Sequence, residues 1–200
     1  QIAVDRSGNN NNGELTNGPK RAIGKLGQAL DFDGSDDYVD VAINSSLNVT
    51  NFTVSVWINP DTVSGGIRTI VNKSNNTGAT TNFYIEKVSG GDEIEAGFND
   101  GVSWHSYTTT NLDLKVAEWR HLVMTYDQVR FKVYANGVIN IDTPDTGAPA
   151  TANGTVRFSS VQNNTQVWDG LIDEVRVYNR ALTADEIKRL YKIGSTFIVN

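Results

Sequence analysis

The sequence predicts an all-β protein built as a sandwich of two antiparallel sheets, with a short helix close to the C-terminus. Short runs of alternating apolar and polar residues recur along the chain, and turn residues separate them. The 18 glycines and the hydrophobic content of 38% suit many short strands joined by tight turns. Because 200 residues can bury a full-sized core, we expect one domain over residues 1–200.

The chain opens with a polar loop over residues 5–18. This loop is rich in asparagine, and Gly8 and Gly13 allow sharp bends. Its side-chain oxygens suit a hard cation such as calcium, although a cluster of solvated turns would have the same composition. Both interpretations stay open for the loop alone.

Residues 28–43 are predicted to form an acidic hairpin. Leu30 and Phe32 alternate with carboxylates, the pair Asp33-Gly34 turns the chain, and an extended run resumes at Tyr38. The aspartates of this segment are Asp31, Asp33, Asp36, Asp37 and Asp40. Like charges repel one another unless a cation lies among them. The alternative is that the carboxylates face water, which we expect of Asp31 and Asp40.

Further strands are predicted in the middle of the chain. The run 52–60 alternates cleanly, with Trp57 on the face opposite to Phe52, and Pro60 ends it. The pair Asn136-Gly137 indicates a hairpin. The remaining strands are expected at 67–72, 82–88, 93–98, 102–108, two runs within 118–136, 138–141 and 155–161.

The segment 170–182 is predicted to be the strand around which the chain is organised. Leu171, Val175 and Val177 share one face of this strand, and other apolar residues occupy the opposite face. A strand that is apolar on both faces is expected in the middle of a sheet, covered on each side. Asp173 lies inside this apolar run, so its carboxylate needs a partner.

A short helix is predicted directly after that strand. Residues 183–186 have the pattern of a capping box, and the helix is expected to run to about Ile193. Ile187, Leu190 and Tyr191 then share one face, which can dock on a sheet.

Charge and composition exclude several classes of partner. The net charge of −6 argues against nucleic acid and against anionic membrane surfaces, because both attract basic proteins. No apolar run approaches the length of a membrane span, so we expect no membrane insertion. The absence of cysteine excludes a disulfide framework and thiol chemistry.

Several stretches, taken in order, resemble one family. They are Ser7-Gly8-Asn9, Gly13-Glu14-Leu15, residues 27–34, Tyr38-Val39, residues 52–58, Trp119-Arg120-His121-Leu122-Val123, residues 134–137 and residues 170–178. This ordered set resembles the LamG-like jelly-roll domains of the concanavalin A-like lectin/glucanase superfamily, which are related to laminin G and pentraxin domains. The resemblance covers nearly the whole chain and implies a two-sheet jelly roll with one concave sheet.

The resemblance also implies a structural calcium ion between the N-terminal loop and the last long strand. Asp173 matches the acidic ligand of the final strand, and Asp5 matches the acid before the Ser-Gly-Asn turn. The weaker matches are Asn12, Gly13, Asp33 and Gly34. A salt bridge to Arg176 or the capping of a loop amide would also satisfy Asp173.

One part of the family pattern is missing. Such domains begin with an aromatic first strand, which here is absent or reduced to residues 1–4. The apolar tail, residues 196–200, is a candidate to fill that place by pairing with an open sheet edge.

We expect no catalytic residues. Some relatives are glycoside hydrolases, which need two carboxylates across a sugar-binding cleft. Glu93 and Glu95 share a face of one predicted strand, but Ile94 stands where the glucanase pattern has another acid. Solvated strand carboxylates are the simpler interpretation, and the histidines form no defensible triad.

The ligand-binding residues are expected among aromatic and polar side chains, because lectin sites stack rings on sugar faces and bond their hydroxyls. The candidates are Tyr84, Trp104, His105, Tyr107 and Trp168. The expected partner is a glycan, recognised by a domain that belongs to a larger protein outside the cell or on its surface. The alternative is a non-catalytic adhesive or structural domain that binds a cell-surface protein, since one fold serves both purposes.

Overall fold

The computed structural model describes residues 1–75, 80–151 and 153–195 and contains two antiparallel sheets that face each other. This confirms the predicted all-β jelly-roll sandwich with a short C-terminal helix. The tail at residues 196–200, which the sequence suggested as a replacement first strand, lies outside the described residues.

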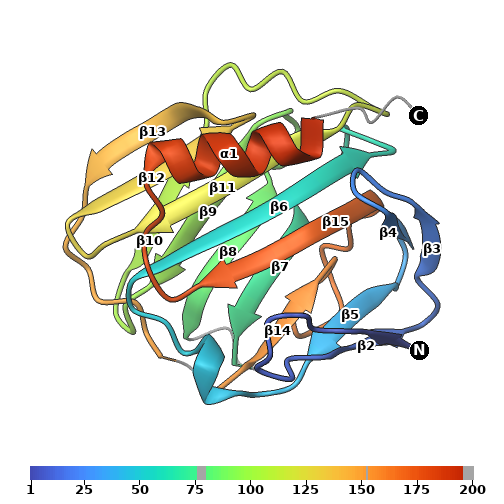
Figure 1. Cartoon of the computed structure of the whole chain (residues 1–200), viewed down its shortest axis with the longest axis horizontal. Coiled ribbons are helices and arrows are strands. Elements are labelled where there is room, and N and C mark those ends of the chain that lie inside the picture. Colours follow the sequence, from blue (N-terminus) through green and yellow to red (C-terminus); the bar gives the residue numbers. More distant parts are fainter. Residues whose placement is uncertain (76–79, 152, 196–200) are drawn as a thin grey trace.

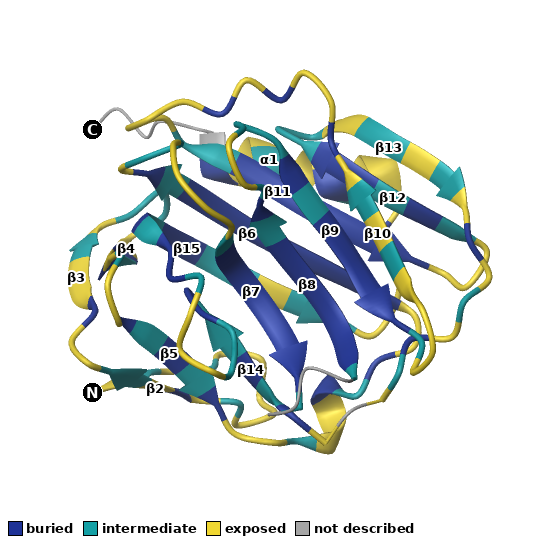
Figure 2. Cartoon of the chain, turned by 180° about the vertical axis from the view of Figure 1, so that it is seen from behind, coloured by how far each residue is buried: buried dark blue, intermediate teal, exposed yellow. Residues whose placement is uncertain are grey.

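Sheet A has the strand order β1-β2-β5-β14-β7-β8-β9-β10 (Figure 2). Its strands are β1 (Ile2–Ala3), β2 (Gly13–Thr16), β5 (Tyr38–Val41), β14 (Thr155–Phe158), β7 (Arg68–Ser74), β8 (Thr81–Lys87), β9 (Ile94–Asn99) and β10 (Trp104–Thr108). Every neighbouring pair is antiparallel. The N-terminal residues therefore do enter the sheet, as the short edge strand β1.

Sheet B has the order β13-β12-β11-β6-β15-β4-β3 (Figure 1). Its strands are β13 (Val138–Pro144), β12 (Arg130–Ala135), β11 (Arg120–Tyr126), β6 (Phe52–Pro60), β15 (Asp169–Tyr178), β4 (Gln28–Asp33) and β3 (Lys20–Ile23). The edge strand β3 was not predicted, because its sequence shows no clear alternation. The strand β15 lies inside the sheet between β6 and β4, as its two apolar faces predict.

The main core lies between the sheets and is dominated by aromatic and β-branched side chains. Phe52 of sheet B packs against Phe83 of sheet A, with ring centroids 6.0 Å apart. Phe98 packs against Tyr126 in the same way at 4.7 Å. These rings join the two sheets into one hydrophobic layer.

The helix α1 (Ala184–Ser195) lies across the outer face of sheet B (Figure 1). A reciprocal capping box starts it: the Glu186 amide donates to Thr183 Oγ1, and the Thr183 amide donates to Glu186 Oε2. Ile187 is fully buried against Val123 and Tyr134 of the sheet. This confirms the predicted capping box and the docking of one helix face. No helix in the described part of the chain is long and apolar enough to cross a membrane.

Candidate functional site

The outer face of sheet A, meaning the side turned away from sheet B, is left free by the helix. On β8, Phe83 and Ile85 point into the core, so Tyr84 and Glu86 point to the outer face. Figure 2 shows that β7, β8 and β9 in the middle of this sheet are mostly buried, whereas β10 at its edge is largely exposed. The edge at β10 is therefore an accessible part of this face.

The strand register places a line of residues across the outer face. Asn72 on β7 lies opposite Tyr84, which lies opposite Gly97 on β9, and Gly97 lies opposite Ser106 on β10. The Tyr84 hydroxyl reaches past Gly97 to Ser106 Oγ at 2.5 Å. A Cβ at position 97 would lie 2.1 Å from the carbonyl oxygen of His105, so only glycine allows β9 and β10 to approach this closely.

A parallel line of residues carries two carboxylates. Glu86 on β8 lies directly opposite Glu95 on β9, and Glu95 lies opposite Thr108 on β10. Glu95 accepts hydrogen bonds from the hydroxyls of Tyr84, at 2.8 Å, and Thr108, at 3.2 Å. Burial, and then the charge of Glu95, raise the pKa of Glu86 to about 7.

Trp104 supplies an exposed aromatic surface beside these polar groups. Its side chain is at the start of β10 and the residue is 55% exposed. Its ring stands edge-on to the ring of Tyr84, with centroids 5.6 Å apart and an interplanar angle of 83°. Burial raises the pKa of the Tyr84 hydroxyl, so this group stays a neutral hydrogen-bonding partner. We call the set Tyr84, Glu86, Glu95, Trp104, Ser106 and Thr108 the outer-face site.

His105 and Tyr107 lie on the opposite side of β10 from Trp104. The His105 ring stacks on Phe98 at 4.5 Å, and its Nδ1 is 2.9 Å from Asp145 Oδ2. The Tyr107 hydroxyl donates to the same Asp145 oxygen at 2.6 Å, and its ring packs on a core phenylalanine. The structure thus separates these two residues from Trp104 and ties both to Asp145.

Trp168 does not reach the outer-face site. It is fully buried in the core, and its backbone amide donates to the carbonyl oxygen of Ser159 at 2.8 Å. Of the predicted ligand-binding residues, the structure therefore places Tyr84 and Trp104 together on an outer surface. Trp168 belongs to the core cluster between the sheets.

Asp5 and its neighbours form a loop that is closed by its own hydrogen bonds. The Asp5 carboxylate accepts from the Ser7 amide and hydroxyl and from the Asn11 amide. The Asp5 amide donates to Asn12 Oδ1 at 2.8 Å. Gly13 lies in β2, where a Cβ would be 2.4 Å from Cγ1 of Val39. Burial acts to raise the pKa of Asp5, but the hydrogen bonds from Ser7 and Asn11 together lower it below its usual value.

Asp173 has a backbone partner on a different loop. It is 6% exposed, and its Oδ2 accepts from the Leu26 amide at 2.9 Å while its Oδ1 accepts from the Glu174 amide at 2.8 Å. Gly24 leaves room for this carboxylate, since a Cβ there would lie 2.5 Å from Oδ2. Burial nonetheless raises the pKa of Asp173. Asp173 therefore caps a loop amide, which is one of the alternatives that the sequence left open for it.

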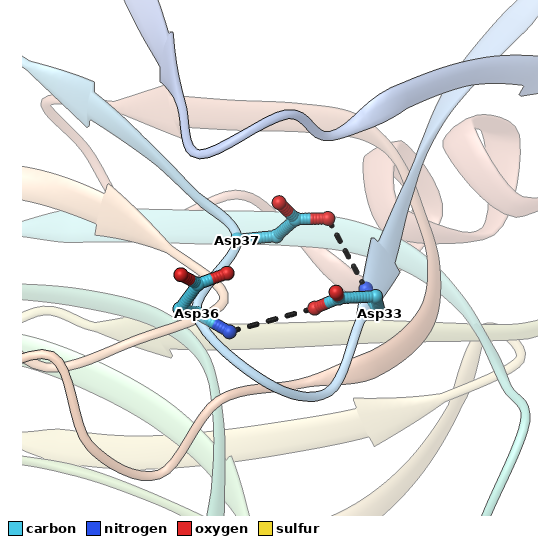
Figure 3. A group of neighbouring side chains, drawn as sticks. All are labelled: Asp33, Asp36 and Asp37. Carbon is cyan, nitrogen blue, oxygen red and sulfur yellow. Dashed lines mark hydrogen bonds between the residues drawn. The ribbon is translucent and has the colours of Figure 1, made fainter.

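Asp33 lies in a separate acidic turn between β4 and β5. Asp33, Asp36 and Asp37 each offer a carboxylate oxygen within 4.8 Å of the others (Figure 3). Asp33 Oδ1 accepts from the Ser35 amide, and Asp37 Oδ2 accepts from the Asp33 amide. Gly34 turns the chain with φ of 71°. Burial, partly offset by the bond from the Asp33 amide, raises the pKa of Asp37.

The predicted metal ligands Asp5, Asp33 and Asp173 therefore do not form one cage. Asp33 lies opposite Asp169 on β15, and Asp173 is four residues farther along that strand, or about 13 Å. Within the described residues, the acidic turn is the one group in which three or more carboxylates or histidines come close enough to share an ion.

Sequence reasoning missed Glu86, and it considered Glu93 only as a solvated strand carboxylate. Glu93 precedes β9 and accepts hydrogen bonds from Thr109 Oγ1 and the Asn111 amide, so it is occupied by the chain itself. The carboxylate that faces Glu95 is Glu86 on the neighbouring strand. Alternation within residues 82–88 already places Glu86 on the same face as the predicted Tyr84, and this signal could have identified Glu86.

Comparisons with known structures agree with this architecture. The binding domain of botulinum neurotoxin serotype G is similar, with a TM-score of 0.74 at 16% identity, over 96% of this chain and 49% of that one. The binding domain of Paraclostridial Mosquitocidal Protein 1 has a TM-score of 0.74 at 19% identity, over 94% and 48% of the two chains. The botulinum neurotoxin serotype D ligand binding domain, in complex with N-acetylneuraminic acid, has a TM-score of 0.73 at 19% identity, over 94% and 47%.

These similarities concern the fold, because the identities are low. The chain spans about half the length of each of these binding domains. A search of curated protein sequences gave no significant match. A family model does match, over residues 33–188, and that range includes the strands from β5 to β15, the outer-face site and the start of α1. By this match the chain belongs to the concanavalin A-like lectin/glucanases superfamily.

Proposed function

We propose that this protein is a carbohydrate-binding module and that the outer-face site holds the sugar. The observation that carries the proposal is the exposed Trp104 ring, set edge-on to Tyr84 beside hydroxyl and carboxylate groups. An aromatic ring can stack on the apolar face of a sugar, and neighbouring oxygens can bond its hydroxyls. Ser106 and Thr108 are exposed on the same face and provide such groups.

The proposed role is recognition and not hydrolysis. Glu95 is already held by two hydroxyls, and the outer-face site lies on an open strand surface at the edge of the sheet. The similar structures are named as binding domains, and one of them holds N-acetylneuraminic acid.

We propose further that the domain works outside the cell as a part of a larger protein.

Calcium also stays a proposal, now for a different set of oxygens. Asp33, Asp36 and Asp37 could share an ion, and carboxylate oxygens are the ligands that calcium prefers. An ion there would relieve the repulsion of these acids and fix the turn between β4 and β5. This location is remote from the outer-face site, so the expected role is structural.

An adhesive role through protein contacts is the second candidate. The edge strand β13 exposes Val138 and Ile139, at 69% and 46%, and an exposed apolar edge can pair with another chain. A protein that binds no glycan but associates through β13 would favour this role.

The test is a glycan array followed by titration of the best ligand. Trp104→Ala should weaken binding about tenfold, because the loss of one stacked ring costs up to about 1.5 kcal/mol. Val102→Ala is the matched control, since Val102 is 92% exposed in the adjacent loop. Equal affinity of the two variants would remove Trp104 from the site, and a blank array would remove the proposed function.

A further inference from the structure

The outer-face site contains a pair of like charges at close range. Glu86 and Glu95 are direct partners on adjacent antiparallel strands, with both side chains on the outer face. Directly opposite residues have Cβ atoms about 4.5–5.5 Å apart, and like charges in such pairs destabilise a sheet. The chain retains this pair on the face that carries its exposed tryptophan, although a neutral residue on either strand would remove the repulsion.

No basic side chain of the described residues neutralises the pair. None of the ion pairs in residues 1–75, 80–151 and 153–195 includes Glu86 or Glu95. Arg68 and Lys87 face each other one residue away from Glu86 along their strands, so their side chains point to the inner face of the sheet. Lys87 Nζ donates to the carbonyl oxygen of Val88, and Arg68 Nη1 donates to that of Val167.

An arginine of the outer face, Arg157, is also occupied. Arg157 lies on β14, beyond β7, and its Nε is 3.1 Å from Asp40 Oδ1. The same guanidinium donates to Asn164 Oδ1 at 2.7 Å. The charge balance at Glu86 and Glu95 is therefore negative and uncompensated, which also agrees with the raised pKa of Glu86.

A second observation on the same face is an unpaired hydrogen-bond acceptor. Asn72 is 6% exposed and lies opposite Tyr84 in the neighbouring line of residues. Its Oδ1 is buried and has no hydrogen-bond partner. An unpaired buried acceptor costs free energy. This acceptor lies on the same face of sheet A as the two uncompensated carboxylates and the exposed Trp104 ring.

We propose that the outer-face site selects sugars with a free, protonated amino group, with the ammonium between Glu86 and Glu95 and the sugar ring on Trp104. This inference rests on the proposed function and specifies its ligand class. An ammonium can donate to both carboxylates and gains further from the face of an indole ring. An acidic sugar would instead meet the negative charge of Glu95, together with that of Glu86 where it is ionised, and repulsion at about 4–6 Å costs about 1–4 kcal/mol for each pair of charges.

The experiment compares three probes at about pH 7 by calorimetric titration. They are a glucosamine trimer, the fully N-acetylated trimer and sialyllactose. We expect the amine trimer to bind about tenfold tighter than the acetylated trimer, and sialyllactose to give no signal. Glu86→Gln should remove this preference while keeping affinity for the acetylated trimer, whereas Glu118→Gln, a change at an exposed loop carboxylate, should leave the preference intact.

The outcomes separate the two proposals. Equal binding of the acetylated and free-amine trimers, or tighter binding of sialyllactose, would overturn the amine selectivity and leave glycan binding in place. Failure of all three probes together with a blank glycan array would overturn the proposed function itself. Glu95→Gln is a second variant, which should also remove the preference. This variant weakens the bonds of residue 95 to Tyr84 and Thr108, so the result of Glu86→Gln decides the test if Glu95→Gln does not fold.

Discussion

Replacing Asp173 with asparagine tests what a buried carboxylate does in the middle of this fold. Both oxygens of Asp173 accept backbone hydrogen bonds, one from the Leu26 amide and one from the Glu174 amide. The first bond ties the loop between β3 and β4 to β15, and the second holds the bulge of β15, where Glu174 has φ of 49°. An asparagine side chain keeps the shape but must present an NH₂ group to one of these amides.

The expected loss follows from that mismatch. A hydrogen bond to a charged acceptor contributes about 1.5–3 kcal/mol. The raised pKa of Asp173 shows that burial disfavours its charge, and asparagine avoids that penalty. We therefore expect a net loss of about 2 kcal/mol in the free energy of unfolding, which lowers the Tm of a domain of this size by about 4–8 °C.

The assay is thermal unfolding followed by circular dichroism, with calcium and with a chelator. Asp173→Asn should lower the Tm by the same amount in both conditions, because its partners are backbone amides. Glu118→Gln, at an exposed loop position, is the control and should leave the Tm unchanged. An unchanged Tm of Asp173→Asn would refute the hydrogen-bond argument, and a loss seen only with calcium would restore Asp173 as a metal ligand.

Two further predictions concern titration and metal binding. Burial, and then Arg176, lower the pKa of His121 to about 4. The unfolded chain therefore takes up the proton first, and stability should fall by up to about 3 kcal/mol as the pH falls from about 6.5 to about 4. Urea unfolding at both pH values measures this loss. If a His121→Gln variant lost as much stability between the two pH values as the unchanged protein, His121 would not be the group responsible. For calcium, Asp36→Asn should abolish any rise in Tm on adding the ion, whereas a rise that survives in this variant would place the ion elsewhere.

The sequence was sufficient for most of the elements and insufficient for their partners. Alternation located the strands apart from the short ones near the N-terminus, such as β3, and the pair Thr183 and Glu186 located the start of α1, because these signals involve residues that are near neighbours in the chain. The same alternation places Trp104 and His105 on opposite faces of β10, so their separation was already present in the sequence. Which of them faces outward depends on the sheet behind, which local patterns do not describe.

What the sequence by itself determined is therefore the sandwich, its capped helix and the burial of Asp173 inside an apolar strand. Only the tertiary structure decided that Leu26 satisfies this carboxylate and that Glu86 stands opposite Glu95. The physical reason is that the direction of a side chain repeats every second residue along one strand, whereas its neighbours are set by register. Register depends on turns, bulges and the fit of distant strands, and a shift of one residue would have paired Glu95 differently.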